Sequence, residues 1–188
     1  MNIRLKAKLK TLFILNKKKR HEKRNELIKQ LQMEKWKEAI RKQAKSVGEN
    51  LYVGGYSFVN KNTVLANNVS MNGLKVYGEG NIKIGQYFHS GVEVMIIAQN
   101  HNYDNGNAIP YDDTYIYKDI EIGDFVWLGS RVMILPGTKI GEGAIIQGGA
   151  VVHGEIPPYA IAGGNPAKVF KYRDIEHFKK MKEEGRFH

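Results

Sequence analysis

The sequence contains no cysteine, which excludes disulfide bonds and any chemistry that needs a thiolate. Proline is scarce, with five residues against 20 glycines, and this ratio favours many tight turns over a disordered chain. No apolar run approaches the ~20 residues of a membrane-spanning helix. The apolar stretch Leu12–Leu15 is also shorter than the ~7–15 residues of a secretory signal core. We therefore expect a cytoplasmic protein of one domain with an appendage.

Acidic residues are few near the N-terminus, and this makes the charge of the chain uneven. Residues 1–50 hold 16 Lys and Arg against 5 Asp and Glu, a net charge of +11. Residues 51–188 hold 13 Lys and Arg against 14 Asp and Glu, a net charge of −1. The overall charge of +10 therefore belongs to the N-terminal appendage and not to the rest of the chain.

Residues 1–45 also lack proline and glycine, and they are rich in residues that favour helices. We predict a basic helical extension over 1–48, broken into two helices near Asn16–His21, with Leu5, Leu9 and Leu12 at helical spacing. Three roles stay open for it: packing on the protein itself or its trimer, binding an anionic membrane at its inner face, or binding nucleic acid. Nucleic acid is disfavoured because no recognition motif accompanies the charge.

The rest of the chain is dominated by a six-residue repeat. Apolar residues recur at every sixth position: Ile122, Leu128, Ile134, Ile140, Ile146 and Val152. A small or β-branched residue follows each of them by four positions: Val126, Val132, Thr138, Ala144, Ala150 and Ile156. This period fits neither a helix nor a single strand. It predicts a solenoid of short strands and turns.

The repeat begins earlier in another phase and is interrupted once. Val53, Val59, Leu65 and Met71 share one register, which slips and restarts at Ile84. Residues 99–118 have no repeat character, and the register resumes at Ile122. An insertion with intact repeats on both sides predicts a loop that projects from the solenoid, and such loops often carry function.

Several motifs resemble those of the hexapeptide-repeat acyltransferases, in the branch that O-acetylates sugars and xenobiotics. They are Asp124–Gly129 (DFVWLG), Ile134–Gly137 (ILPG), Gly164–Lys168 (GNPAK) and the pair Asn100–His101 in the loop. The resemblance covers about residues 50–175 and implies an all-β, left-handed parallel β-helix over 49–172. It also implies a homotrimer with active sites between subunits. A short C-terminal helix over 173–188, with Asp174 as N-cap, should follow.

His101 is the predicted general base, as the matching histidine is in the family. Acetyl transfer to a hydroxyl needs a group that accepts the hydroxyl proton, and a neutral imidazole can do so. Asn100 and Asp104 are candidates to orient the ring or to meet the acceptor. Tyr103, with Tyr111 and Tyr115, is a candidate to stack on a sugar. His89 is an alternative base, since it lies twelve residues before His101 and could line the same side of the solenoid.

The resemblance also implies a groove for acetyl-CoA, the expected co-substrate. Glycines would let the pantetheine arm approach, and cations would meet the phosphates. The predicted cofactor residues are Trp127, Gly129, Ser130, Gly148, His153, Lys168 and Lys171, with Arg173 able to assist. No metal is expected.

The resemblance therefore implies an acetyl-CoA-dependent O-acetyltransferase that acts on a sugar hydroxyl of a cell-surface polysaccharide or related glycan. N-acetylation of a nucleotide-linked amino sugar and antibiotic acetylation stay open as alternatives. A zinc carbonic anhydrase of the same fold is disfavoured because the sequence has no His-x₄-His pair. A binding protein without catalysis is a remote alternative.

Overall fold

The computed structural model describes residues 3–188, with side chains from Lys17 onward. The chain divides into two units, the helical residues up to Lys35 and the body Trp36–His188. Helix α1 runs from Ile3 to Gln43 without interruption. The predicted break near Asn16–His21 is therefore wrong, because no proline or glycine there removes a helical hydrogen bond. The predicted stripe of leucines before residue 13 has its side chains outside the described residues.

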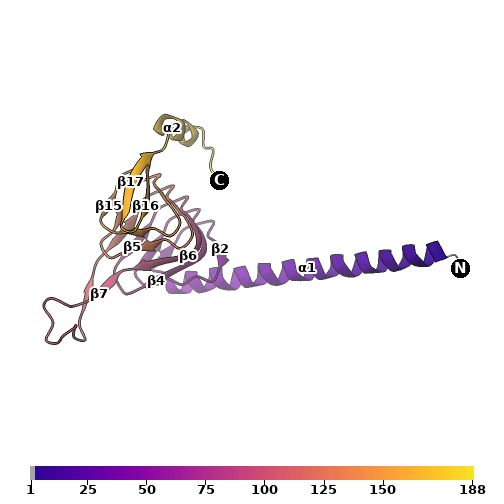
Figure 1. Cartoon of the computed structure of the whole chain (residues 1–188), viewed down its shortest axis with the longest axis horizontal. Coiled ribbons are helices and arrows are strands. Elements are labelled where there is room, and N and C mark those ends of the chain that lie inside the picture. The colour runs from indigo at the N-terminus through magenta and orange to yellow at the C-terminus, as the bar shows by residue number, and fades with distance from the viewer. Residues whose placement is uncertain (1–2) are drawn as a thin grey trace. The chain divides into compact units, whose positions relative to one another are not determined.

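The body is a parallel β-helix whose coils each present three faces (Figure 1). Face 1 consists of β1 (Ser46–Val47), β3 (Thr63–Leu65), β5 (Ile82–Ile84), β9 (Ile120–Ile122), β12 (Lys139–Ile140) and β15 (Glu155–Ile156). Face 2 consists of β2 (Tyr52–Gly55), the first halves of β4 (Ser70–Tyr77) and β6 (His89–Ile97), β10 (Trp127–Leu128), β13 (Ile145–Ile146) and β16 (Ala160–Gly164). Face 3 consists of the second halves of β4 and β6, β11 (Met133–Ile134) and β14 (Val151–Val152). The predicted all-β solenoid is confirmed, with about six turns.

Strands stack on one another in a parallel register that repeats once per coil. Glu121 pairs with Lys139, which lies 18 residues further on, so each face takes one six-residue unit. Ile82 pairs with Ile120 across 38 residues. The 20 extra residues are the loop, and the ladder continues past it without a gap. The loop therefore leaves the scaffold intact.

The two positions of the repeat supply the core. All twelve residues named for the register from Ile122 to Ile156 are buried, at 4% exposure or less. Val53, Val59, Leu65 and Met71 of the earlier register are buried as well. The phase slip after Met71 coincides with register shifts where β2, β4 and β6 turn from face 2 to face 3. The six-residue period is thus interrupted in the sequence where the number of residues at this corner of the coil changes.

Each end of the solenoid is covered by another element. At the start, Ile40 near the end of α1 is fully buried, and the Gln43 side chain accepts a hydrogen bond of 3.0 Å from the Val59 N–H. Strand β1 at Ser46 is already part of the first coil, three residues before the predicted boundary at 49. At the other end, β17 (Ala167–Tyr172) folds back antiparallel on β16.

Helix α2 (Ile175–Glu183) follows β17, close to the predicted bounds. Asp174 is the N-cap, and its carboxylate accepts a 2.9 Å hydrogen bond from the His177 N–H. The Phe178 ring contacts the rings of Phe125 and Tyr159, with centroids 5.8 and 5.1 Å away. The helix therefore packs over the corner that joins faces 1 and 2.

Candidate active site

The loop over 99–118 leaves the solenoid where face 3 passes into face 1, and it projects from the coils (Figure 1). Its two ends form a hairpin of β7 (Gln99–His101) and β8 (Tyr115–Tyr117), in which His101 pairs with Tyr115. The Lys118 N–H returns to the Ala98 carbonyl at 3.2 Å, which closes the loop on the coil. His101 thus stands on a short hairpin at the edge of a rigid scaffold.

The tip of the loop is held by a network of polar side chains that the sequence analysis missed. Asp112 Oδ1 accepts hydrogen bonds from the Thr114 hydroxyl and N–H, and its Oδ2 accepts one from the Asn107 N–H. These bonds, that of the Thr114 hydroxyl first, lower the pKa of Asp112. Asn102 Nδ2 also donates to the Thr114 hydroxyl. Asp112 therefore organises the loop that carries His101; its spacing to Thr114 is the common signal of an Asp turn.

The His101 ring lies against two tyrosines. Its centroid is 3.8 Å from that of Tyr111 and 4.8 Å from that of Tyr115. Its Nδ1 is buried and has no hydrogen-bond partner within the described residues. A buried polar atom without a partner is uncommon, and a catalytic role is one explanation for it. Tyr111 and Tyr115 therefore support the imidazole in this structure, whereas the Tyr103 ring makes no contact with the His101 ring within the described residues.

Asn100 and Asp104 are also exposed, and neither side chain is hydrogen-bonded to His101. Asn100 pairs with Ile116 in the hairpin. The proposed role of these residues in orienting the ring is thus not seen within one chain. Their role toward an acceptor stays a prediction.

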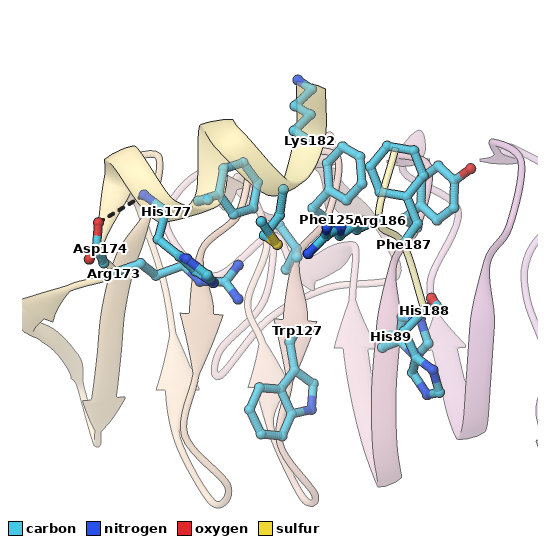
Figure 2. A pocket seen from close by; sticks show the side chains of 14 residues that line it. His89, Phe125, Trp127, Arg173, Asp174, His177, Lys182, Arg186, Phe187 and His188 are labelled. Carbon is cyan, nitrogen blue, oxygen red and sulfur yellow. Dashed lines mark hydrogen bonds between the residues drawn. The ribbon is translucent and has the colours of Figure 1, made fainter. Parts of the chain in front are cut away.

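His89 does not share a side of the solenoid with His101, so that expectation is wrong. His89 starts the face 2 half of β6 and is the register partner of Trp127. A step of twelve residues covers two faces of a three-faced coil, and only a full coil of 18 residues returns to the same face. Figure 2 shows His89 beside His188, whose carbonyl lies 3.1 Å from His89 Nε2.

Three of the predicted cofactor residues meet at the corner between faces 2 and 3. A Cβ on Gly129 would lie 2.5 Å from the Gly148 nitrogen, and a Cβ on Gly148 would lie 3.0 Å from the Ser130 carbonyl oxygen. Neighbouring coils are therefore in contact here, and Gly129 and Gly148 leave this corner free of side chains. We call the corner formed by Gly129, Ser130 and Gly148 the glycine edge. The Gly129 N–H donates to the Ile146 carbonyl at 2.8 Å and is not free for a ligand. The Gly148 N–H has no acceptor within the described part of the chain.

The other predicted cofactor residues are divided between two places. Trp127 is 54% exposed on face 2, just before Gly129. Lys168 and Lys171 are exposed on β17, where Lys168 pairs with Gly163. His153 lies instead at the corner between faces 3 and 1, because β14 separates it from Gly148. His153 is therefore not part of the glycine edge of its own chain, and its role toward acetyl-CoA stays a prediction.

Arg173 is engaged within its own chain. Its Nη1 donates to the Gly143 carbonyl at 3.1 Å, and its guanidinium lies 5.0 Å from the centre of the Phe178 ring. Burial lowers the pKa of Arg173. These contacts indicate that Arg173 anchors α2.

The described residues contain no group of three or more His, Cys, Asp or Glu that could hold a metal ion. In the same part of the chain, no helix combines the length and apolar character needed to cross a bilayer.

Comparison with known proteins places the repeat in a family. The family model of the bacterial transferase hexapeptide, with six repeats, matches residues 119–154. The chloramphenicol acetyltransferase of Morganella morganii is 53% identical over 93 residues, which are 43% of this chain and 44% of that protein. That of Escherichia coli is 38% identical over 96 residues, which are 44% and 46% of the two chains. The chain thus spans about half the length of these curated relatives.

A solved structure extends the likeness beyond the repeat. The maltose O-acetyltransferase from Clostridium difficile 630 has a TM-score of 0.53 and 29% identity, and the match covers 69% of this chain and 66% of that one. The resemblance of this chain to the hexapeptide-repeat acyltransferases is therefore confirmed, and residues 119–154 carry the repeat that defines them.

Proposed function

We propose that this protein is an acetyl-CoA-dependent O-acetyltransferase that acts on a sugar hydroxyl, with His101 as general base. The observation that carries the proposal is the imidazole of His101, held between Tyr111 and Tyr115 on the one long loop with its Nδ1 unpartnered in the described residues. No side-chain hydrogen bond within the described residues engages the imidazole, and its Nε2, in contrast to the buried Nδ1, is the nitrogen that we propose for the acceptor hydroxyl. The likeness to acetyltransferases supports the same reading.

In the proposed reaction, the acceptor oxygen attacks the carbonyl carbon of the acetyl thioester while His101 takes the hydroxyl proton. The C–S bond breaks, and the proton passes from the imidazole to the departing thiolate of coenzyme A. A base in this role contributes roughly 10²–10⁴-fold to the rate. No covalent enzyme intermediate is needed, and a chain without cysteine can perform every step.

The glycine edge is the proposed track of the pantetheine arm. Gly129 and Gly148 leave it free of side chains, and the Gly148 N–H is available to a pantetheine carbonyl. Ser130 lies on the same edge, Trp127 would flank the thioester, and Lys168 and Lys171 would meet the phosphates. Because His101 stands at a different corner, the two halves of the site would come from neighbouring chains.

The chemistry of the faces supports a homotrimer of this kind. Face 1 exposes an alternating ladder of charges: Lys83, Glu121, Lys139 and Glu155. Face 3 presents Met95, Met133 and Val151 in one half-buried apolar row. Burial of such a row against another chain is favourable, whereas burial of the charged ladder would be costly. We therefore assign face 3 to the interface between copies.

Turnover assays test the proposed function. Release of the coenzyme A thiol should be seen with a hydroxyl sugar, and replacement of His101 by alanine should lower kcat/KM at least a hundredfold. His21→Ala, on the exposed surface of α1, is the matched control and should have no effect. Unchanged turnover in His101→Ala would refute the mechanism.

The acceptor is separated by a panel in the same assay. Maltose-like hydroxyl sugars, nucleotide-linked amino sugars and chloramphenicol represent the three open classes. Chloramphenicol is included because the curated relatives are named for it. Turnover of amino sugars alone would replace O-acetylation by N-acetylation.

We also propose that the basic extension, up to residue 45, attracts the protein to anionic lipid at the inner face of the cytoplasmic membrane. Its described part exposes Leu27, Ile28 and Leu31 beside many Lys and Arg side chains. Binding to vesicles with 30% anionic lipid should fall when residues 1–45 are deleted and when salt is raised. Binding that survives the deletion would contradict this proposal.

A further inference from the structure

A cavity of about 610 Å³ lies between α2, the residues after it and face 2. Figure 2 shows Trp127 and His89 projecting from neighbouring strands on one side and α2 on the other. The chain turns after α2 at Gly185, with φ of +64°, and the Arg186 N–H donates to the Met181 carbonyl. This turn brings Phe187 and His188 back over face 2. The volume falls within the ~300–1,000 Å³ of ligand sites.

The rings around this cavity, which we name the α2 cavity, form one cluster. Tyr87 and Phe125 stack with centroids 5.0 Å apart and planes 3° apart. Phe187 packs on both, at 4.5 and 5.2 Å, yet it is 41% exposed. Trp127 on the opposite wall is more than half exposed. Phe187 and Trp127 therefore offer exposed aromatic surface on two sides of the cavity. The ring of a ligand bound between them would gain stacking contacts.

The Lys and Arg side chains that line the cavity each have a partner within the chain. Lys182 pairs with Glu142, whose hydrogen bond raises the pKa of Lys182. Arg186 Nε lies 2.9 Å from a Glu184 carboxylate oxygen. Arg173 is bound to the Gly143 carbonyl. Each of these cations already has a partner within the chain, and the rings of Tyr87, Phe125, Trp127, Phe178 and Phe187 supply much of the remaining wall, which favours an aromatic ligand over a phosphate or carboxylate.

From these contacts we propose that the α2 cavity binds an uncharged planar aromatic ring. Two sources could supply that chemistry: an aryl group of the acyl acceptor, which would keep Trp127 beside the thioester, or the adenine of coenzyme A, which would place Trp127 at the nucleotide end of the cofactor instead. The assignment to either source rests on the proposed function, because Trp127 stands two residues before Gly129 on the proposed pantetheine track. The presence of a ring site does not rest on it.

Equilibrium dialysis without acetyl-CoA tests the site independently of turnover. Chloramphenicol, which is an aryl-bearing alcohol, and adenosine, which is an uncharged nucleoside, are the two ligands. We expect one of them to bind, and the ligand that binds identifies the source of the ring. Failure of the acetyl-transfer assays would leave this result untouched.

Variants of Phe187 make the test specific. Phe187→Ala removes one stacking wall and should weaken binding about tenfold, which is about 1.4 kcal/mol. Phe187→Trp keeps a ring and should retain binding. Phe170→Ala is the matched control, because Phe170 is also an exposed phenylalanine and lies on β17 outside the cavity.

Two results would overturn the proposal. One is the absence of binding by both ligands to the unmodified protein. The other is equal binding by Phe187→Ala and Phe170→Ala, with circular dichroism showing both variants folded.

Discussion

At the scale of single residues, the position of His101 depends on a side chain with no chemical role. Asp112 accepts three hydrogen bonds that fix the loop tip. We predict that Asp112→Asn lowers kcat/KM about tenfold, because the amide nitrogen offers no acceptor to the Asn107 N–H. A misplaced base costs rate without changing the core. Steady-state kinetics should show this loss, and the unfolding temperature should stay within a degree or so.

The pKa of Asp112 gives this prediction a pH dependence. Its pKa is lower in the folded loop than the usual ~3.9, so the hydrogen bonds are complete above that value and are lost as pH falls through the lowered pKa. The protection of the Thr114 and Asn107 amide protons against exchange, measured relative to an unstructured chain at the same pH, should be kept at pH 5 and be lost only in more acidic solution. Equal exchange rates in Asp112→Asn and the unmodified protein at pH 5 would contradict this role.

Gly143 shows how closely one residue can be constrained. Its φ is +68°, and a Cβ there would lie 3.0 Å from both Phe178 and Tyr159. We predict that Gly143→Ala costs about 2–4 kcal/mol in the free energy of unfolding, from backbone strain and from displacement of Phe178.

Gly154→Ala is the control for Gly143→Ala in urea titrations. Gly154 has a φ of +73° but nothing within 4 Å of its Cβ position, so it isolates the backbone cost of about 1 kcal/mol. Equal losses in the two variants would mean that α2 does not press on Gly143.

At the scale of elements, α2 is a surface helix with no buried residue, so its cap matters. We predict that Asp174→Ala costs about 1 kcal/mol, because the His177 N–H loses its acceptor. Urea unfolding measures the loss. Asp174→Ser keeps a capping oxygen and should recover most of it; failure to recover would point to a charge effect instead.

The sequence predicted elements well where local chemistry decides them. Asp174 marked the start of α2 correctly, and the six-residue register marked every inward position from Ile122 to Ile156. The sequence-based prediction failed where a residue's place depends on how the coils are arranged in space. His89 lies two repeat periods before His101 but stands on another face, and a period of six does not say which face a residue occupies. The sequence also did not predict the α2 cavity, because its lining residues lie up to about 100 positions apart in the chain.

At the scale of the whole molecule, the three faces differ in chemistry, and we predict a trimer through face 3. Met133→Glu places a charge in its apolar row and should yield monomers at micromolar concentration, since burial of an unpaired charge is costly. Sedimentation velocity measures the change. Turnover should fall with it, because the two halves of the proposed site would separate.

Glu121→Gln on face 1 is the control for this experiment, because it changes one charge on the face that we leave to solvent. It should sediment as the unmodified protein does. A trimer that persists in Met133→Glu would move the interface to another face.

The ladder from Ile82 to Ile120 passes the insertion as though the twenty residues between the coils were absent. Substitutions in the segment that bears His101 can therefore accumulate in evolution without destabilising the coils of the solenoid. Proteins that share this solenoid can then differ in the acceptor that they modify, while the sequence of the solenoid changes independently of the loop. Chimeras that exchange only residues 99–118 between relatives would show whether the loop alone changes which acceptor is modified.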